Sequence, residues 1–335
     1  MTATRRCRPA ALVTGAGGFI GANLVRRLLA EGHQVTAVVR PGGEPWRLER
    51  ADADVVELDL REPDDVADLI GDRRPAWVFH LAAHGAYSWQ RDAADILRVN
   101  VLGTQAVLDA ALDCGAEAIV QAGTSSEYGR KDHAPSEDEA LEPNSVYAAA
   151  KACATMLASE TARRRGASVT TLRVYSAYGP WEDPRRLVPT LLANALGGQL
   201  PDLVAAETAR DFVWIEDVVG AFLLAARTPQ RRPGAVYNVG SGTQTTVGEL
   251  VEKTRALLGV AAEPKWGSAA ARDWDTSTWV ADPSRISSEL GWSSDVEVGE
   301  GLRRMLQWLE ATPEVHERYG VSAAPARSPT SPLDD

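Results

Sequence analysis

The sequence has little of what marks several large classes of protein. Its three cysteines, Cys7, Cys114 and Cys153, are too few and too scattered for a disulfide framework or a cysteine-bound zinc site. No apolar run reaches the length of a membrane span, and the first residues lack the apolar core of a signal peptide. These deficits predict a protein of the reducing cytoplasm without a membrane partner.

An excess of positive charge and metal-binding histidine patterns are also missing. The net charge of −11 argues against general nucleic-acid binding, which needs a basic surface. The five histidines show no metal-ligand spacing, so we expect no metal site. With 44% hydrophobic and 24% charged residues, the 335-residue chain has the composition of an ordinary globular protein, with one large domain or two smaller ones.

What the sequence does contain starts with a glycine-rich stretch, LVTGAGGFIG, at residues 12–21. An apolar run leads into Gly15, Gly18 and Gly21 and then into a helical pattern, which indicates a strand, a glycine turn and a helix. A helix N-terminus beyond such a turn offers free N–H groups and a positive dipole end to a pyrophosphate. A tight turn without a ligand is the alternative, and the rest of the chain argues against it.

Strands expected at 35–39, 55–58, 76–81, 118–122 and 169–174 alternate with helical segments. This alternation predicts an α/β fold, a Rossmann-type doubly wound parallel sheet with ligands at the carboxyl ends of its strands. We expect residues 10–175 and 211–242 to form this domain, with 211–226 and 235–240 returning to the main sheet. Residues 176–210 and 243–312 then form a smaller substrate-binding lobe, and the Ala-, Pro- and Ser-rich tail 313–335 is expected to be disordered.

The cofactor preference depends on the residue that ends the second strand, which is Arg40. An acidic residue there accepts the ribose hydroxyls of NAD, whereas an arginine accommodates the 2′-phosphate of NADP. Arg40, helped by Arg47, therefore favours NADP(H). A strand-end arginine that only faces water is the alternative, and it leaves NAD(H) open.

A pair of residues suited to proton transfer follows on a predicted helix capped by Asn144. Tyr147 and Lys151 are four residues apart and share one helical face. A tyrosine can pass a proton to a carbonyl oxygen, and a nearby lysine cation lowers its pKa. Thr124, at the end of a preceding strand, could bind the same oxygen. A packed tyrosine with a solvated lysine is the alternative, but the glycine turn and the hydroxyl-rich strand end favour catalysis.

Taken in order, the motifs of the chain resemble those of the extended short-chain dehydrogenase/reductase family, in its nucleotide-sugar epimerase, dehydratase and 4-ketoreductase branch. The motifs are VTGAGGFIG (13–21), HLAA (80–83), NVLGT (100–104), TSSEYG (124–129), YAAAK (147–151), YGP (178–180), RDFVWIEDV (210–218), YNVGSG (237–242) and ELGW (289–292). The resemblance implies an enzyme acting on a nucleotide-diphospho-sugar. It also implies a homodimer formed through the helices at 92–112 and 145–165.

The resemblance also assigns roles to particular residues. Tyr147 would be the acid/base, Lys151 its electrostatic partner and a ribose contact, and Thr124 the third catalytic group. The expected cofactor-binding residues are Gly15, Gly18, Phe19, Ile20, Gly21, Arg40, Asp59, Leu60, Leu81, Ala82, Ala83, Asn100, Tyr147 and Lys151. The expected substrate-binding residues are Tyr87, Ser88, Ser125, Ser126, Ser176, Arg185, Arg210 and Arg272. The last two would grip the diphosphate. Loop packing is an equal alternative for Tyr87 and Ser88, and for Trp89 beside them.

Departures from the family pattern narrow the reaction. Related 4,6-dehydratases carry an Asp-Glu pair directly after the catalytic threonine, where this chain has Ser125 and Ser126. Related decarboxylases place a glutamate two residues after it, whereas Glu127 is three after and would point to the opposite face. The asparagine usual before YGP is replaced by Ser176.

Simple redox at C4 of the sugar remains. We expect NADPH-dependent reduction of a 4-keto nucleotide-diphospho-sugar, of the 4-keto-6-deoxyhexose type, with Tyr147 as proton donor. An NAD-dependent nucleotide-sugar 4-epimerase is the alternative. A non-catalytic NADP-sensing protein is a second alternative.

Overall fold

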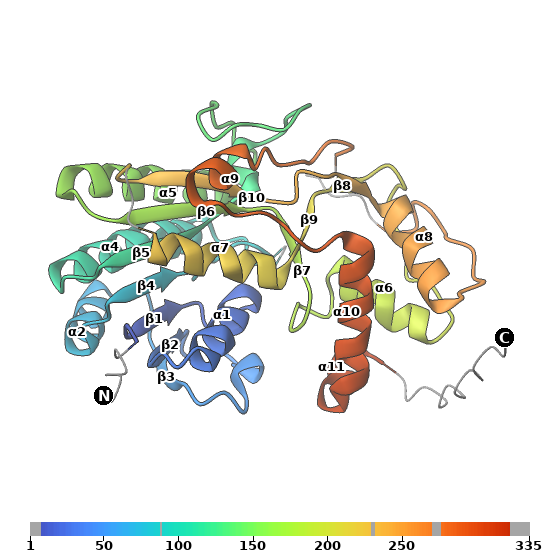
Figure 1. Cartoon of the computed structure of the whole chain (residues 1–335), viewed down its shortest axis with the longest axis horizontal. Helices are drawn as coiled ribbons and strands as arrows, with labels where there is room; N and C mark the ends of the chain where they lie inside the picture. The colour runs from blue at the N-terminus through green and yellow to red at the C-terminus, as the bar shows by residue number, and fades with distance from the viewer. Residues whose placement is uncertain (1–7, 88, 229–231, 270–275, 322–335) are drawn as a thin grey trace, which may run out of the picture.

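A seven-stranded parallel sheet forms the centre of the larger part of the molecule (Figure 1). The structure, a computed structural model, describes residues 8–87, 89–228, 232–269 and 276–321. The strand order is β10-β6-β5-β4-β1-β2-β3, and every pairing is parallel. The strands are β1 (Ala11–Thr14), β2 (Val35–Val39), β3 (Asp54–Glu57), β4 (Trp77–His80), β5 (Ala118–Thr124), β6 (Val169–Val174) and β10 (Ala235–Val239). The predicted doubly wound fold is confirmed.

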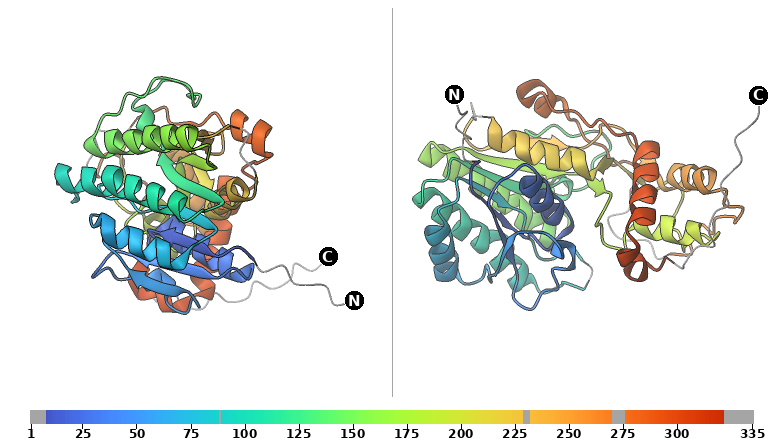
Figure 2. Two further views of the ribbon diagram at one scale, coloured as in Figure 1. Left: turned by 90° about the vertical axis from the view of Figure 1, so that its left-hand side faces the viewer. Right: turned by 60° about the horizontal axis from the view of Figure 1, so that its bottom comes forward.

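Helices cover both faces of the sheet (Figures 1 and 2). One face packs against α1 (Phe19–Ala30) and α7 (Ile215–Arg227), and the other against α2 (Pro63–Arg73), α4 (Gly103–Asp113) and α5 (Val146–Arg165). Successive residues of a strand point to opposite faces. Val13 accordingly joins the apolar cluster under α1 and α7, while Leu12 joins the cluster under α2 and α4. The near-continuous apolar strands of the sequence therefore reflect burial on both faces.

The helix expected at 92–112 contains an irregular turn. It consists of α3 (Ala93–Leu97), a π-helical turn η2 (Arg98–Leu102) and α4. Asp92 caps its start, accepting hydrogen bonds from the backbone N–H groups of Ala94 and Asp95. Such π turns are often found at functional sites, and this one carries Asn100.

The cap of α5 was predicted one residue too early. Ser145, not Asn144, is the N-cap, and its hydroxyl accepts a hydrogen bond from the backbone N–H of Ala148. An N-cap side chain accepts from the backbone N–H three residues after it, which for Ser145 is that of Ala148. Asn144 lies four residues before Ala148, one residue too early for this bond.

A smaller lobe, separate from the sheet, contains α6 (Leu187–Leu196), α8 (Val247–Leu258), α10 (Val298–Ala311) and α11 (His316–Tyr319) (Figure 1). Two short sheets accompany it: β7 (Ser176–Tyr178) with β9 (Phe212–Trp214), and β8 (Ala209–Arg210) with β11 (Thr245–Thr246). We expected residues 211–226 to rejoin the main sheet. This was wrong for β9, because within this segment only α7 packs on the main sheet. Helix α9 (Ser284–Leu290) lies against β10.

The start of the tail was also predicted wrongly. Residues 313–321 fold as a 3₁₀ turn η4 (Pro313–Val315) and α11, with Val315 and Tyr319 buried in the core. The Tyr319 hydroxyl donates a hydrogen bond of 2.6 Å to the Glu182 carbonyl. This contact spans 137 residues, so local composition could not reveal it. Residues 322–335 lie outside the described residues.

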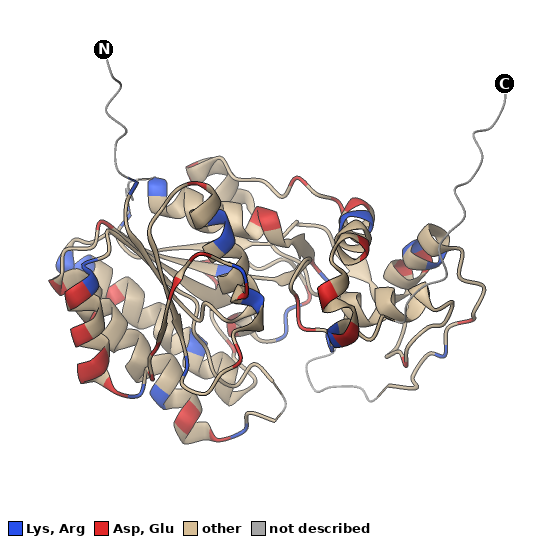
Figure 3. Ribbon diagram, turned by 90° about the horizontal axis from the view of Figure 1, so that it is seen from below, with Lys and Arg blue, Asp and Glu red and all other residues tan. Residues whose placement is uncertain are grey.

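Acidic and basic residues are interspersed along the helices in the view of Figure 3. None of the helices among the described residues is both long enough and apolar enough to cross a membrane.

Candidate active site

The chain reverses its direction across the sheet between β1 and β4, which are neighbours. Ligands of doubly wound folds bind at the carboxyl ends of the strands beside such a point. The glycine turn follows β1 there and has no room for a larger residue. Gly15 has a φ of +68°, and a Cβ on it would lie 2.6 Å from the backbone nitrogen of Ala82. Gly18 is the N-cap of α1, and no side chain caps the first N–H groups of that helix. This cradle fits a dinucleotide pyrophosphate.

A buried hydrogen-bond chain joins the ends of β1 and β4. The His80 Nδ1 lies 2.7 Å from the Thr14 hydroxyl, and its Nε2 lies 3.0 Å from the Thr104 hydroxyl. Burial, with the Lys151 charge nearby, lowers the pKa of His80 to about 3, so the ring is neutral. Since Thr104 donates its proton to the Asn100 carbonyl, His80 Nε2 donates to Thr104 and Nδ1 accepts from Thr14.

Asn100 binds the backbone of the loop after β4. Its side-chain oxygen accepts from the His84 N–H (2.8 Å), and its side-chain nitrogen donates to the His84 carbonyl (2.7 Å). The side chain is fully buried, and its predicted role in cofactor binding stays a prediction. Asn100 holds the loop after β4, which runs against the catalytic helix: a Cβ on Gly85 would lie 3.4 Å from the Tyr147 ring.

The ends of β2 and β3 carry the residues expected around the adenosine part of the cofactor. Arg40 is exposed, and no side-chain partner for it is found among the described residues. Arg47 is not its helper: the buried Arg47 guanidinium donates to the carbonyls of Trp181 and Gly17. Asp59 is held by Arg61, whose Nη2 lies 2.6 Å from Oδ2.

The remaining predicted cofactor residues lie along the same sheet edge. Phe19 and Ile20 are in the first turn of α1, and Leu81, Ala82 and Ala83 directly follow β4. Leu60 packs into the core so closely that a Cβ on Gly103 would lie 3.0 Å from it.

Three predicted catalytic residues meet at the carboxyl end of β5. The Tyr147 hydroxyl is hydrogen-bonded to Thr124. Burial and the negative charge of Glu127 raise the pKa of Tyr147 to about 12, although Arg186 and Thr124 oppose this. Lys151 is buried one helical turn later, and burial lowers the pKa of its ammonium. At neutral pH the phenol therefore keeps its proton, which suits a proton donor.

The hydroxyls after Thr124 form a tight 3₁₀ turn, η3 (Ser125–Tyr128). The Thr124 hydroxyl donates to the Ser126 Oγ at 3.3 Å and accepts from the Ser126 N–H at 3.2 Å. Glu127 turns away from them and is 0% exposed. Its carboxylate accepts from the Thr124 N–H (2.9 Å) and from Arg173 Nε (2.8 Å). The glutamate is thus a structural anchor, committed to a buried ion pair.

Loop residues from the two parts of the chain meet at the entrance to the site. Tyr87 and Trp89 stack with ring centroids 4.6 Å apart, and Arg185 lies 4.3 Å over Trp89. Arg185 also pairs with Asp183 at 2.7 Å, so this predicted substrate residue already has a partner. Arg186 lies 5.4 Å over the Tyr87 ring, and its charge opposes the rise in the pKa of Tyr147. Arg186 was missed, because nothing in its local sequence places it beside Tyr147.

Arg210 and Ser176 lie at the boundary of the lobe. Arg210 donates to the Ala209 carbonyl, and its guanidinium lies 5.5 Å from the Trp279 ring centroid. Ser176 donates its backbone N–H to the Asp211 carbonyl. The predicted residues Ser88 and Arg272 lie outside the described residues. Within the described parts of the chain, no three His, Cys, Asp or Glu side chains gather in a way that could hold a metal ion.

Asp211, which the sequence reading passed over, anchors the segments around Arg210. Its buried carboxylate accepts hydrogen bonds from the backbone N–H groups of Ser241, Gly242 and Ala281. Its place directly after a predicted ligand arginine was the available signal, but its partners are 30 and 70 residues away.

Comparisons with known proteins agree with this geometry. Residues 11–240 match the model of the NAD dependent epimerase/dehydratase family. A dTDP-glucose 4,6-dehydratase of Streptomyces griseus is 34% identical over 95% of this chain and 98% of its own length. The structure of a UDP-glucose 4-epimerase of Thermotoga maritima with UDP-glucose has a TM-score of 0.82 at 28% identity, covering 91% of this chain and 99% of its own. The structure of MoeE5 with UDP-glucuronic acid and NAD has a TM-score of 0.79 at 33% identity, covering 90% and 99%.

The family match spans well over half of the chain, from the first strand of the sheet to the turn after β10. It includes the glycine turn, Thr124, Tyr147 and Lys151. The chain belongs to the NAD dependent epimerase/dehydratase family, in the extended short-chain dehydrogenase/reductase group of nucleotide-sugar enzymes.

Proposed function

We propose that this enzyme reduces a 4-keto nucleotide-diphospho-sugar of the 4-keto-6-deoxyhexose type with NADPH. The observation that carries the proposal is Arg40, exposed at the end of β2 where an NAD-binding enzyme would have an acidic residue. A guanidinium there pairs with a 2′-phosphate. An enzyme that reduces once and then exchanges its cofactor fits NADPH better than one that recycles a retained NAD.

The residues of the site supply the proton side of this reaction. A bound reduced nicotinamide supplies the hydride that goes to C4. Tyr147 donates its phenolic proton to the C4 oxygen as the C=O bond becomes a C–O–H group, and water returns a proton to the phenolate. Thr124 holds the same oxygen, and Lys151 places positive charge where the phenolate forms.

The turn after Thr124 supports redox over dehydration. Elimination of water needs a general acid and a general base, and serine hydroxyls such as those of Ser125 and Ser126 are poor at both roles at neutral pH. Glu127 is the nearest carboxylate in sequence, and its oxygens are occupied by Arg173 and the Thr124 N–H.

A 4-epimerase is the second candidate. It is supported by the likeness to the UDP-glucose 4-epimerase and by MoeE5, whose structure holds NAD. In that case Tyr147 removes and returns the same proton while the cofactor stays bound.

The cofactor released on denaturing the purified protein distinguishes the two. For the reductase we expect an empty or exchangeable site that binds NADPH more tightly than NADH. We expect Arg40→Asp to change that preference at least about tenfold, or ~1.4 kcal/mol. Stoichiometric NAD, with Arg40→Asp without effect, would refute the reductase and favour the epimerase.

A Tyr147→Phe variant tests whether the protein is an enzyme or only senses NADP. We expect turnover of 4-keto nucleotide sugars to fall by about 10²–10⁴-fold, since the proton donor is lost. Cofactor affinity should change little. Unchanged turnover would contradict the role of Tyr147.

The site also supports a nucleotide diphosphate as part of the substrate. Arg210 lies at the lobe boundary beside Trp279, and a guanidinium binds phosphate oxygens in a two-pronged geometry. We propose the division of labour expected above: the sheet domain binds the cofactor, and the lobe binds the nucleotide sugar.

We further propose a homodimer in the cytoplasm. Four exposed apolar side chains lie on the neighbouring elements α3, η2 and α5: Leu97, Leu102, Val146 and Met156. Cys114 and Cys153 are both free, as in a reducing compartment.

A further inference from the structure

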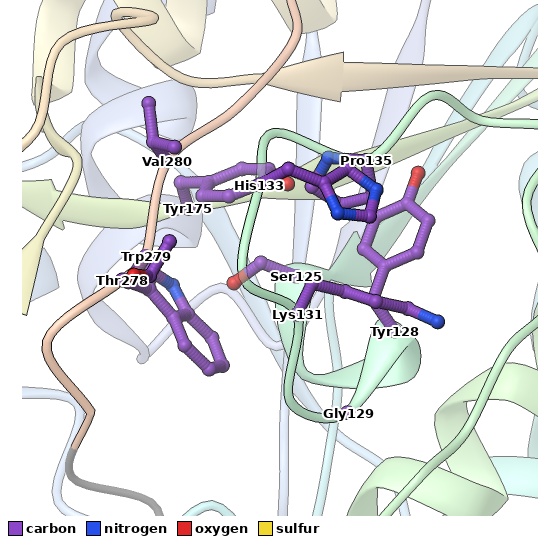
Figure 4. A pocket seen from close by; sticks show the side chains of 10 residues that line it. All are labelled: Ser125, Tyr128, Gly129, Lys131, His133, Pro135, Tyr175, Thr278, Trp279 and Val280. Carbon is purple, nitrogen blue, oxygen red and sulfur yellow. The ribbon is translucent and has the colours of Figure 1, made fainter.

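A hollow is lined by Ser125, the residue after Thr124, and by Trp279 (Figure 4). The hollow is small and partly open to solvent. In Figure 4, Thr278 and Trp279 form one wall, Lys131 and His133 lie on the other, and the Ser125 hydroxyl points toward Trp279. The lining residues are Ser125, Tyr128, Gly129, Lys131, His133, Pro135, Tyr175, Thr278, Trp279 and Val280.

Two tyrosines line this hollow, and their hydroxyls differ. The Tyr128 hydroxyl donates to Asn238 Oδ1 at 2.7 Å and accepts from Arg173 at 2.8 Å. The Tyr175 hydroxyl is buried and has no hydrogen-bond partner among the residues that the structure describes, and the whole residue is only 8% exposed. A buried hydroxyl without a partner is costly, so its presence calls for an explanation.

Packing fixes Tyr175 in this place. Its backbone N–H donates to the Val239 carbonyl at 3.0 Å, and it directly follows the last residue of β6. Tyr175 thus lines the hollow with a side chain whose hydroxyl donates to no group in the described part of the chain.

The charges around the hollow favour a neutral guest. Lys131 lies 3.1 Å from Glu142, and His133 lies 2.8 Å from Asp132 and 2.9 Å from Glu139. The Lys131 ammonium and the His133 ring each already contact a carboxylate, so a second carboxylate would find both groups occupied. A hydroxyl, which accepts from Tyr175 and exchanges a bond with Ser125, fits these walls.

The position of the hollow relative to the chemistry identifies the part of the sugar concerned. Ser125 is the residue after Thr124, which holds the C4 oxygen under the proposed function. Trp279, on the opposite wall, contacts Arg210, the expected diphosphate ligand. A substituent on a ring carbon next to C4 would thus enter between them.

We propose that this hollow is a subsite for a neutral hydroxyl-bearing substituent on C3 or C5 of the sugar, selected by a hydrogen bond from Tyr175. The inference rests on the proposed function, since it takes the placement of C4 from it. For a 6-deoxy substrate, whose C5 carries a methyl group, the C3 hydroxyl is the group recognised.

The test compares affinities of the cofactor-loaded full-length protein for nucleotide sugars that differ by one group. Titration calorimetry uses UDP-glucose, UDP-3-deoxyglucose, UDP-xylose and UDP-glucuronic acid, and the dTDP forms of the first three. These sugars vary the substituent on C3 and on C5, and they compare a neutral C5 substituent with a carboxylate. Wild-type protein should lose at least about tenfold in affinity when the recognised hydroxyl is removed. Tyr175→Phe should bind the two members of that pair within about threefold of each other, because it lacks the donor.

Tyr128→Phe is the matched control in the same hollow. It should lower the free energy of unfolding, because it breaks two bonds, and leave the ratio between the sugars unchanged. Tyr175→Phe should not lower the free energy of unfolding. The proposal is overturned if Tyr175→Phe weakens all the sugars equally or none, or if UDP-glucuronic acid binds more tightly than UDP-glucose through Tyr175.

Turnover separates this inference from the proposed function. A sugar-specific effect of Tyr175→Phe without turnover of any 4-keto sugar supports the subsite and refutes the reductase. Turnover of a 4-keto sugar without a sugar-specific effect of Tyr175→Phe supports the reductase and refutes the subsite. Absence of binding by every nucleotide sugar refutes both.

Discussion

At the scale of single residues, buried charged side chains that take no part in the proposed reaction hold the site in place. The Glu127–Arg173 pair is nearly fully buried, and Arg173 also donates to the Tyr128 hydroxyl and the Glu137 carbonyl. This cluster fixes Thr124, because Glu127 binds the Thr124 N–H. The position of Thr124 thus depends on an ion pair behind it.

We expect Glu127→Gln to lower the free energy of unfolding by about 3–5 kcal/mol, since it leaves the Arg173 charge buried without its partner. Urea denaturation measures this. Glu160→Gln is the control, because it breaks an exposed pair with Arg164 on α5 and should cost less than about 0.5 kcal/mol. Equal effects of the two substitutions would show that burial does not govern the Glu127 pair.

A second buried carboxyl makes stability depend on pH. Burial raises the pKa of Glu182 from its ordinary 4.5 to about 8, against the opposing charge of Arg186, and its Oε2 has no hydrogen-bond partner within the described segments. Between these two pH values the folded chain holds a proton that the unfolded chain has released. The free energy of unfolding therefore falls as the pH rises from about 4.5 to 8.

We expect Glu182→Gln to flatten this dependence, so that its gain over wild type grows steadily from pH 5 to pH 8. Urea denaturation at several pH values gives the slope. The two proteins should be similar near pH 4.5, where the wild-type carboxyl is protonated in the folded state. If Glu182→Gln shows the same slope as wild type, the pH dependence of the free energy of unfolding comes from other groups.

At the scale of elements, the glycine turn and the π turn position the loops of the cofactor site. The turn after β1 passes so close to Ala82 that no side chain fits at Gly15. The π turn carries Asn100 to the His84 backbone, which a regular helix would present differently. Both devices bring the ends of β1 and β4 together.

We expect Gly15→Ala to lose at least about 1–3 kcal/mol of folding free energy, because it forces a side chain into positive φ and onto Ala82. Cofactor affinity, followed by fluorescence titration with NADPH, should fall at least about tenfold, or ~1.4 kcal/mol. Gly71→Ala in α2 is the control: its Cβ position is open and helical, so it should gain about 0.5–1 kcal/mol. Full NADPH affinity in Gly15→Ala would contradict the cradle.

At the scale of the whole molecule, contacts between distant segments join the lobe to the cofactor domain. Asn23 of α1 donates to the Pro180 carbonyl, and Arg47 links Gly17 to Trp181. The Tyr319 hydroxyl binds the Glu182 carbonyl from the other side. The loop after YGP is thereby tied to the glycine turn and to the C-terminal helix at once.

The outer surface of the catalytic helix sets the expected assembly. We expect wild-type protein to have about twice the 35.9 kDa mass of one chain by light scattering. Leu102→Glu with Met156→Glu should give a monomer, since both side chains are exposed and apolar on adjoining elements. Val55→Glu, at an exposed position on edge strand β3, should leave the dimer intact. A monomeric wild type would refute the dimer.

Much of this protein follows from its sequence alone. The strands, most helices and the glycine turn are local patterns, since side-chain periodicity and glycine placement are read within a dozen residues. The spacing of Tyr147 and Lys151 likewise places both on one helical face without further information. The order of the motifs identified the family that the comparisons confirm.

Tertiary structure decided what depends on residues far apart in the chain. It committed Arg47 to two carbonyls, gave Asn100 to the loop backbone and buried Glu127 against Arg173. It also left the Tyr175 hydroxyl without a partner among the described residues. It also folded residues 313–321 onto the core. Each outcome is a contact or burial across many intervening residues, and such contacts depend on packing, which no local pattern encodes.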